Sequence, residues 1–574
     1  MRHRLLQFLE VLCNYGRSFV VQKQYLHTLT IFATFYAVIR ITTVCLMEYK
    51  EMKVTKLLTF VFLLLAFTVP TMAQEPARLV FGTTDEPDLL DIQQATGTNF
   101  TTSDFLTQPL VFYSLESADV LVPDLATSYS FSEDGLKLTF NLPAGYVFSN
   151  GDPLDADAVR ASIERYRTTS PYPEDWGDLL EMNVLNDSTT LEMIYEAPPA
   201  FMSPVLSSGF GAPFNTGVAE EVGNEAFGAN PVASGPFVLE SWTRGTEMRL
   251  VRNENYRTNL PFVNNKGPVL IDEIVTRFIP DPFTLIAELE AGNLDIVYGV
   301  PSSAVASLQS NPEIEVTELP TAGLQALFFN TAQAPFNDLS FRQALAAAIN
   351  RDVLVQVLEG TVVPQYAFIA EAMVSYDPEV YAYGQEQLAY NPDAARQILN
   401  DAGYVDSDGD GIVEKDGSAV SIELLIATDD AKQMAVGVVL QAMLQEVGIE
   451  ITITQFEQSF IYDRLANRDY GLAIAGYVWW DPDIMLYRFT DAGSNWSGYD
   501  NADVTRLLNE GRTVVDPAAR RAIYSEAQRL LIDDVAAIPL WTESTYIANR
   551  TWVDGLIIHP ITTHMFVNDV TLSR

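Results

Sequence analysis

The chain has 574 residues and a formal net charge of −41, because 75 Asp and Glu residues outnumber 34 Lys and Arg residues. So acidic a protein would be repelled by nucleic acid and by anionic lipid surfaces, which excludes both as partners. Cationic ligands are mildly favoured, although solubility is the simpler explanation of the charge.

Residues 52–73 have the pattern of a secretory signal peptide. Two lysines follow the methionine, an apolar segment covers 57–69, and a small-residue cleavage site at 71–73 precedes Gln74. The apolar segment is shorter than the ~20 residues that a membrane span needs. We therefore expect cleavage before Gln74 and a free protein, periplasmic or extracellular.

Residues 1–51 are a doubtful N-terminal extension. A signal peptide stands at the start of a chain, whereas this one is internal. We expect translation to begin at Met52. The alternative is a genuine extension in which residues 29–39 form an apolar anchor.

Strand and helix patterns alternate along the rest of the chain, which is long enough for roughly three domains. A strand is predicted over 135–142, and strand–helix–strand units over 271–297 and 421–454. Further helical patterns cover 341–360 and 392–403. These units indicate an α/β class with added antiparallel hairpins.

The segment DSDGDGIVEKDG, residues 406–417, begins like an EF-hand calcium loop. Asp406, Asp408 and Asp410 alternate and a glycine follows. The twelfth position, however, is Gly417 instead of the required Glu, and Glu414 at the ninth position is an imperfect substitute. We interpret the segment as a polar turn and keep a structural calcium ion as the alternative.

Residues for catalysis are scarce in this sequence. The two cysteines, Cys13 and Cys45, precede the cleavage site, so neither a disulfide, nor thiol chemistry, nor a lipid-attachment cysteine is expected after it. His559 and His564 are the histidines that remain, and both read as ordinary loop or strand residues. No catalytic residues, no cofactor and no zinc site are predicted. The alternative from a different functional class is an enzyme, a hydrolase that acts through a pair of carboxylates.

A run of aromatic and acidic residues, GYVWWDPDIMLYRF, covers 476–489. Its tryptophans offer flat faces for stacking, and its aspartates can pair with an amine or accept sugar hydroxyls. A buried strand edge is the competing interpretation. The predicted ligand-binding residues are Tyr477, Trp479, Trp480, Asp481 and Asp483.

The stretch LVPDLATSYSFSEDGLKLTFNLPAGYVFSNGDPLDADAVRASIERY, residues 121–166, resembles the hallmark segment of the family 5 solute-binding proteins of ABC importers, the oligopeptide- and dipeptide-binding group. Four more segments follow that family's pattern in order. They are SGPFVLESWTRGTEMRLVRNENYR (234–257), FFNTAQAPFNDLSFRQALAAAINRDVL (328–354), YNPDAARQILNDAGYVDSDGDGIVEKDG (390–417) and NWSGYDNADVTRLL (495–508).

This resemblance implies the α/β two-lobed periplasmic-binding-protein fold, in its type II, large three-domain variant, with a ligand cleft between the lobes. A ligand that touches both lobes would stabilise the closed form, which the permease recognises. Hinges are expected near 329–330 and 539–540. The implied domains are lobe I at 74–115, 232–329 and 539–574, an inserted domain at 116–231, and lobe II at 330–538.

The resemblance also implies a short peptide as ligand, ABC transporter permease subunits as partners, and a monomer. Peptide-binding relatives hold the peptide α-amine with an acid in the loop after a strand like GLAIAGY. That loop is shortened here to 478–483, so Asp481 is either this acid or only the structural Asp of an Asp-Pro pair. An oligosaccharide is the alternative ligand, because the two tryptophans suit a sugar. Nickel has no histidine cluster to support it.

Overall fold

The computed structural model describes residues 76–95, 101–428 and 430–574, and Pro76–Arg574 form one compact unit. The predictions about the start at Met52, the signal peptide and the apolar anchor lie outside these residues. Among the helices of the described ranges, none is long and apolar enough to cross a membrane.

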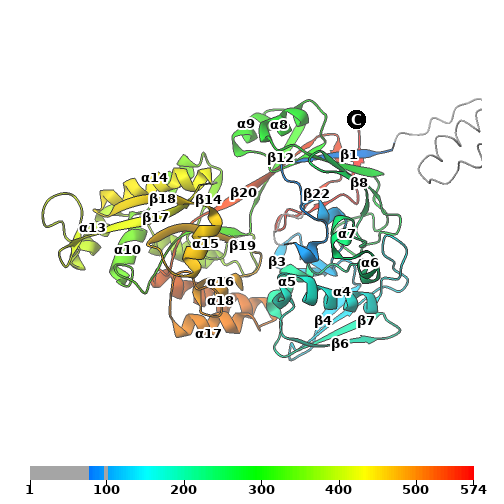
Figure 1. The fold of residues 1–574 in the computed structure, drawn as a ribbon, viewed down its shortest axis with the longest axis horizontal. Coiled ribbons are helices and arrows are strands. Elements are labelled where there is room, and N and C mark those ends of the chain that lie inside the picture. Colours follow the sequence, from blue (N-terminus) through cyan, green and yellow to red (C-terminus); the bar gives the residue numbers. More distant parts are fainter. Residues whose placement is uncertain (1–75, 96–100, 429) are drawn as a thin grey trace, which may run out of the picture. The chain divides into compact units, whose positions relative to one another are not determined.

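A mixed sheet of twelve strands is the centre of the fold, and one long strand joins its two halves. This strand, β20 (Ile538–Arg550), pairs near its start with β13 (Gly323–Phe329) and β14 (Val362–Pro364). Near its end it pairs with β11 (Ile296–Tyr298) and β12 (Ile314–Pro320). Figure 1 shows β20 running from one group of strands to the other.

The unit predicted over 271–297 is confirmed as β10 (Glu273–Phe278), α8 (Pro282–Glu290) and β11. Both strands lie parallel to β1 (Arg78–Thr83), which stands between them. The last three residues of β1 are buried in succession, as expected for a strand inside a sheet that is covered on both faces. We call the core around these strands the first lobe.

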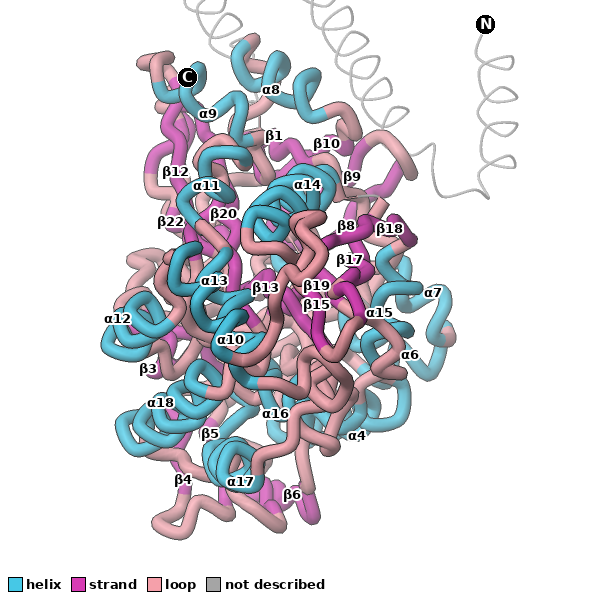
Figure 2. Tube along the Cα trace, turned by 90° about the vertical axis from the view of Figure 1, so that its left-hand side faces the viewer, coloured by secondary structure: helices cyan, strands magenta, loops and turns pink. Residues whose placement is uncertain are grey.

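The unit predicted over 421–454 is confirmed as well, by β17 (Ser421–Ala427), α14 (Ala431–Glu446) and β18 (Glu450–Phe456). The two strands are parallel, and β19 (Leu472–Val478) continues the sheet toward β13. Figure 2 shows α14 beside these strands. We call the core around them the second lobe.

An inserted domain carries its own antiparallel sheet, which includes the strand predicted over 135–142. Helix α4 (Ala156–Thr169) packs on this sheet and begins after Asp155, whose side chain accepts a hydrogen bond from the Ala158 N–H. The strand order is β4 (Ser128–Phe131), β5 (Lys137–Asn141), β7 (Thr190–Tyr195) and β6 (Leu179–Leu185).

The helical pattern over 341–360 forms two helices instead of one, α10 (Leu339–Ala348) and α11 (Arg351–Val357). The break occurs because Asn350 takes an extended conformation and caps the second helix, where its side chain accepts from the backbone N–H of Asp352 and Val353. Asn350 is a recognisable N-cap residue, but the apolar pattern continues across it, so a single helix was predicted.

The remaining elements connect these layers. The helices are α5 (Ser203–Leu206), α6 (Thr216–Val222), α7 (Asn224–Ala229), α9 (Ser302–Gln309), α12 (Pro378–Gln387), α13 (Pro392–Asp401), α15 (Gln458–Ala466), α16 (Ile484–Phe489), α17 (Ala502–Gly511) and α18 (Pro517–Asp533). The strands are β2 (Val111–Ser114), β3 (Ser117–Pro123), β8 (Phe237–Thr243), β9 (Glu247–Arg252), β15 (Glu414–Lys415), β16 (Ser418–Ala419), β21 (Val553–Asp554), β22 (Ile557–Ile558), β23 (Met565–Phe566) and β24 (Thr571–Leu572).

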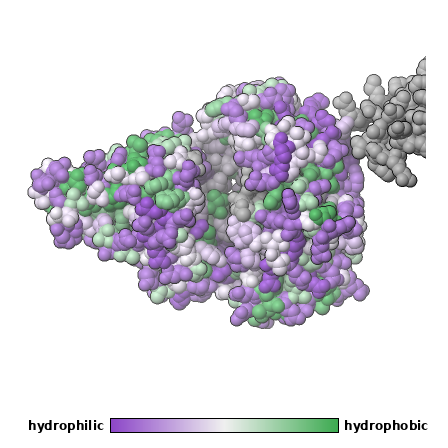
Figure 3. Space-filling model, in the orientation of Figure 1, coloured by the Kyte–Doolittle hydropathy of each residue, from purple (hydrophilic) through white to green (hydrophobic). Residues whose placement is uncertain are grey.

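The buried side chains divide into separate hydrophobic cores. One core extends from Ala322 to Trp541 and defines the second lobe, and another lies within the inserted domain. The second-lobe core includes β13, which the sequence-based boundary at 329–330 assigns to lobe I. That boundary stays a prediction. Hydrophilic and hydrophobic residues are interspersed over the face shown in Figure 3.

Candidate ligand-binding site

A cavity of about 300 Å³ lies where the two lobes and the inserted domain meet. This volume is at the lower end of the range for small-molecule sites. The first lobe contributes Asp85, Thr101, Asp104, Thr107, Pro109, Phe112, Tyr298, Thr321, Thr545, Ile561, Thr562, Thr563 and His564; the inserted domain contributes Pro204, Ser207, Ser208 and Gly209; the second lobe contributes Ala322, Val478 and Trp480. We call this space the central cavity.

Trp480 connects the two lobes at the central cavity. Its indole Nε1 donates a hydrogen bond to the Ile561 carbonyl at 3.2 Å, and its own carbonyl accepts one from the Val374 N–H at 2.8 Å. The indole is thereby held as a wall of the cavity. Of the predicted ligand-binding residues, Trp480 is the one that lines this space.

Trp479 faces a different cavity, although its ring centroid lies only 6.0 Å from that of Trp480. This second cavity, of about 330 Å³, lies between the inserted domain and the second lobe. Phe201 and Tyr487 line it together with Asp483. Neighbouring tryptophans therefore serve two separate spaces.

Asp481 is fully buried and forms a two-pronged ion pair with Arg520. Each carboxylate oxygen accepts from one guanidinium nitrogen at 2.7 Å. One of these oxygens also accepts from the Asp483 N–H at 2.9 Å, while Arg520 Nε donates to the Gly511 carbonyl at 2.7 Å. This carboxylate is thus engaged in fixing the turn after β19.

Asp483 and Tyr477 are also buried and partnered. Arg512 Nε lies 2.8 Å from a carboxylate oxygen of Asp483. Burial raises the pKa of Asp483 to about 7, although Arg512 acts in the opposite direction. The Tyr477 hydroxyl donates to the Phe368 carbonyl at 2.7 Å, and burial raises its pKa above the usual value.

A turn of the first lobe, residues 559–564 between β22 and β23, forms part of the cavity wall beside Trp480. His559 stabilises this turn from inside. Its Nδ1 accepts from the backbone N–H groups of Ile561 and Thr562 at 3.2 and 3.3 Å, so the proton is on Nε2, which donates to the Tyr113 carbonyl at 3.1 Å. Burial lowers the pKa of His559 to about 4, which keeps the ring neutral.

His564 and Asp104 face the central cavity from the first lobe, and the sequence did not single out either for ligand contact. Nδ1 of His564 lies 3.3 Å from an Asp104 oxygen. The His564 ring lies against Phe112 with centroids 5.1 Å apart. His564 was noted in the sequence as one of the two histidines after residue 73 and was interpreted as an ordinary residue, whereas nothing marks Asp104 among 75 acidic residues.

The charges around the central cavity are one-sided. Its acidic lining residues are Asp85 and Asp104, and the residues described as lining it include neither Lys nor Arg. His564 is the one lining side chain there that can become positive. The cavity therefore favours a cationic group over an anionic one.

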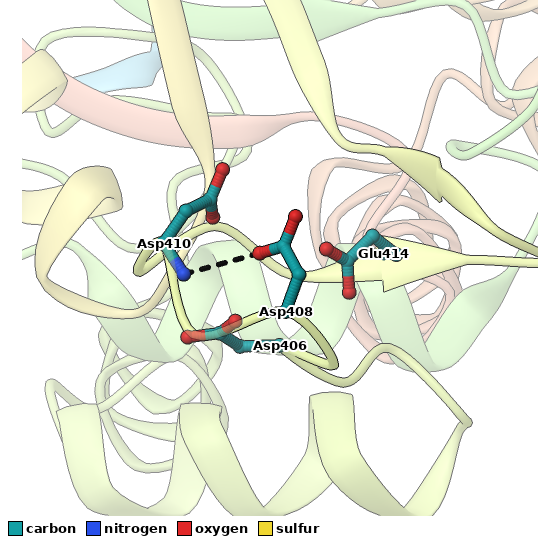
Figure 4. A group of neighbouring side chains, drawn as sticks. All are labelled: Asp406, Asp408, Asp410 and Glu414. Atoms are coloured by element: carbon teal, nitrogen blue, oxygen red, sulfur yellow. Dashed lines mark hydrogen bonds between the residues drawn. The ribbon is translucent and has the colours of Figure 1, made fainter.

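The calcium-like loop links α13 to β17, as predicted for a polar hairpin. The carboxylate oxygens of Asp406, Asp408, Asp410 and Glu414 can approach within 4.8 Å of one another (Figure 4). They also satisfy the loop's own backbone, since Asp406 accepts from the N–H groups of Gly409 and Gly411 at 2.6 and 3.0 Å. These bonds explain the loop without an ion, and calcium stays a prediction.

Two lobes around a cavity, with an inserted domain, define the class of two-lobed solute-binding proteins. The family model for bacterial extracellular solute-binding proteins, family 5, matches residues 120–497, which is more than half of the chain. The protein belongs to this family.

Relatives at low identity support the same assignment. The chain is 26% identical over 528 residues to the probable D,D-dipeptide-binding periplasmic protein DdpA of Escherichia coli K12, covering 88% of this chain and 96% of the relative. It is 26% identical to the nickel-binding periplasmic protein of the same organism, over 80% of this chain and 87% of the relative. The oligopeptide-binding protein AppA of Bacillus subtilis is 24% identical, over 85% and 90%.

Solved structures share the fold. NikA from Brucella suis, in complex with Fe(III)-EDTA, has a TM-score of 0.75 at 22% identity and covers 86% of this chain and 100% of its own. AppA from Bacillus subtilis, in complex with a nonapeptide, has a TM-score of 0.68 at 22% identity, with 87% and 100% covered. The expected fold class, a two-lobed α/β periplasmic-binding-protein fold, is confirmed.

Proposed function

We propose that the protein is the receptor of an ABC importer, which binds a short peptide in the central cavity and delivers it to the permease. The observation that carries the proposal is the position of Trp480, a second-lobe residue that walls the cavity and bonds to the first lobe through the Ile561 carbonyl. A solute in this cavity touches both lobes and stabilises the closed form by its differential affinity.

The receptor is proposed to be non-enzymatic, monomeric, and periplasmic or extracellular. The central cavity offers one histidine beside Asp104 and, among its described lining residues, no cysteine. A single imidazole supports binding of a solute rather than acyl transfer, which needs a nucleophile held against its base. It also gives little support to nickel, which imidazole clusters hold.

The size and lining of the cavity favour a solute of dipeptide or tripeptide size. Apolar walls at Phe112 and Trp480 suit a hydrophobic side chain, and threonine and serine hydroxyls suit a peptide backbone. The same hydroxyls and the Trp480 ring would suit a small oligosaccharide, which is the second candidate. Asp481 is proposed to support the turn through Arg520 instead of contacting the solute.

Neighbouring tryptophans provide a matched test. The dipeptide Phe-Ala and cellobiose are titrated into the purified protein by calorimetry, with product analysis alongside. We expect Trp480→Ala to weaken Phe-Ala binding by about tenfold or more, because a large buried aromatic contact is lost. Trp479→Ala, which changes the other cavity, should alter it less than threefold, that is, by under about 0.7 kcal/mol.

Three results would contradict the proposal. Hydrolysis of the dipeptide would show that the protein is an enzyme rather than a receptor. Binding of cellobiose but not of Phe-Ala would favour a sugar as the ligand. Equal losses of Phe-Ala affinity in the two tryptophan variants would show that the dipeptide does not bind in the central cavity.

A further inference from the structure

Asp104 is an acid at the wall of the central cavity. It lies in the single turn η2 (Ser103–Phe105), where the next residue, Phe105, is 2% exposed and packs into the first-lobe core. The Asp104 side chain is 24% exposed, faces the cavity and meets His564 at 3.3 Å. Its neighbours in the sequence thus fix the backbone while the carboxylate remains at the wall.

The acids of the two lobes differ in what neutralises them. On the second lobe, Asp481 and Asp483 are both held by arginines, and Arg520 occupies both oxygens of Asp481. On the first lobe, Asp104 lies 3.3 Å from the His564 imidazole, and the described residues that line the cavity bring no Lys or Arg to it. The negative charge that a solute meets is therefore on the first lobe.

We propose that Asp104 binds the amine of the solute and that the central cavity selects amine-bearing solutes whose carboxylate is absent or neutralised. This inference rests on the proposed receptor function. A charge-assisted hydrogen bond to a carboxylate gains strength when closure excludes water. A solute carboxylate in the same space meets Asp85 and Asp104 and no lining Lys or Arg of the described chain, so it is disfavoured.

Trp480 completes the recognition from the other lobe. Its ring stands at the same cavity as Asp104, and an indole face attracts a cation. An amine between Asp104 and Trp480 would be bound by both lobes at once. Amine binding and lobe closure would thus be coupled through one group of the solute.

Four forms of one dipeptide test the charge preference. Phe-Ala, its C-terminal amide, its N-acetyl form and the doubly blocked form are titrated by calorimetry at constant pH and salt. We expect acetylation to weaken binding about tenfold to a hundredfold, below the range for fully buried pairs because Asp104 retains contact with water. Amidation of the carboxyl end should strengthen binding, and unchanged affinity for the amide would overturn the selection against a carboxylate.

Asp104→Asn should abolish the preference for the free amine, with less than threefold difference left between the free and acetylated forms. Asp104→Glu, which restores the charge, should recover a part of it. Asp500→Asn removes the same charge from an exposed position that does not line the cavity, and should leave the preference intact. Thermal melts establish that each variant is folded.

The possible failures are distinguishable. Equal affinity for free and acetylated dipeptides overturns the role of Asp104 but leaves a peptide receptor. A preference that survives in Asp104→Asn and disappears in Asp85→Asn moves the role to the other acid and overturns this assignment. If neither the dipeptides nor phenethylamine bind while cellobiose does, both the amine site and the peptide function are wrong.

Discussion

Two turns meet at the central cavity, and they are stabilised by opposite electrostatic means. The second-lobe turn at 479–483 is fixed by a charged pair, Asp481 with Arg520, and Asp483 lies beside Arg512. The first-lobe turn at 559–564 is fixed by a neutral ring, His559, that accepts two backbone hydrogen bonds and donates one. Asp481, which the sequence predicted to bind the ligand, and His559 are both buried and already hydrogen-bonded.

From this comparison we infer that a buried, partnered group fixes each turn and that residues near it line the central cavity. Trp480 precedes Asp481 and lines the cavity, and His564 ends the turn that His559 organises. A buried charge or ring fixes the backbone, and the neighbouring side chain is thereby presented in a fixed direction. Changes to the buried groups should therefore affect stability before they affect selectivity.

The largest effect is expected from Asp481→Asn. This change leaves the Arg520 guanidinium, 4% exposed, without its carboxylate. Removal of one partner from a buried pair costs about 3–5 kcal/mol in the free energy of unfolding. Urea unfolding followed by circular dichroism measures the loss.

Its control is the exposed pair on α17, where Asp503 and Arg506 lie 3.4 Å apart. Asp503→Asn should cost no more than about 1 kcal/mol. If Asp481→Asn is as mild as this control, the turn does not depend on the buried pair. The double variant Asp481→Leu with Arg520→Met should lose less than Asp481→Asn alone.

The neutral turn should be sensitive to acid. Because burial lowers the folded-state pKa of His559 to about 4 from 6.5, the unfolded chain takes up a proton first as the pH falls. The stabilising contribution is complete above pH 6.5 and is lost between pH 6.5 and about 4, by about 3 kcal/mol in total. His559→Gln should lack this component. Thermal melts of both proteins from pH 4 to 7.5 test this, and parallel curves would refute it.

A comparable effect with the opposite sign is expected for Asp483. Its folded-state pKa is raised to about 7 from 3.8, so the wild-type protein loses stability from this group as the pH rises through that window. Asp483→Asn should gain on the wild type between pH 5 and pH 8, by about 2–3 kcal/mol. Denaturant titrations at pH 5 and pH 8 compare the two. If Asp483→Asn becomes less stable relative to the wild type at pH 8 than at pH 5, the attraction of Arg512 for the carboxylate outweighs the cost of burying it.

Much of the fold could be predicted because its signals are local. The units at 271–297 and 421–454 follow from apolar periodicity and helix ends within one short segment. The polar hairpin at 406–417 followed from the helix before it and the strand after it. The break at Asn350 was missed, because an apolar pattern continues across it while a single side-chain cap interrupts the helix.

The site could be predicted only in part, because its residues come from distant segments. Trp480 was expected from the aromatic run in which it stands. Asp104 and His564 come from opposite ends of the described chain and meet only in the folded protein. The pairing of Asp481 with Arg520 was equally hidden, since a sequence shows that an acid is present but not which base satisfies it.

The hydrogen bond from Trp480 to Ile561 also gives the protein an optical property. Indole emission moves to longer wavelength when the ring passes from a protein wall into water, and separation of the lobes would break this bond and wet the ring. Trp479, whose ring is 6.0 Å away and tilted by 43°, is close enough for its electronic transitions to couple with those of Trp480. Opening and closing should therefore be visible in the native fluorescence and near-ultraviolet dichroism of the unlabelled protein.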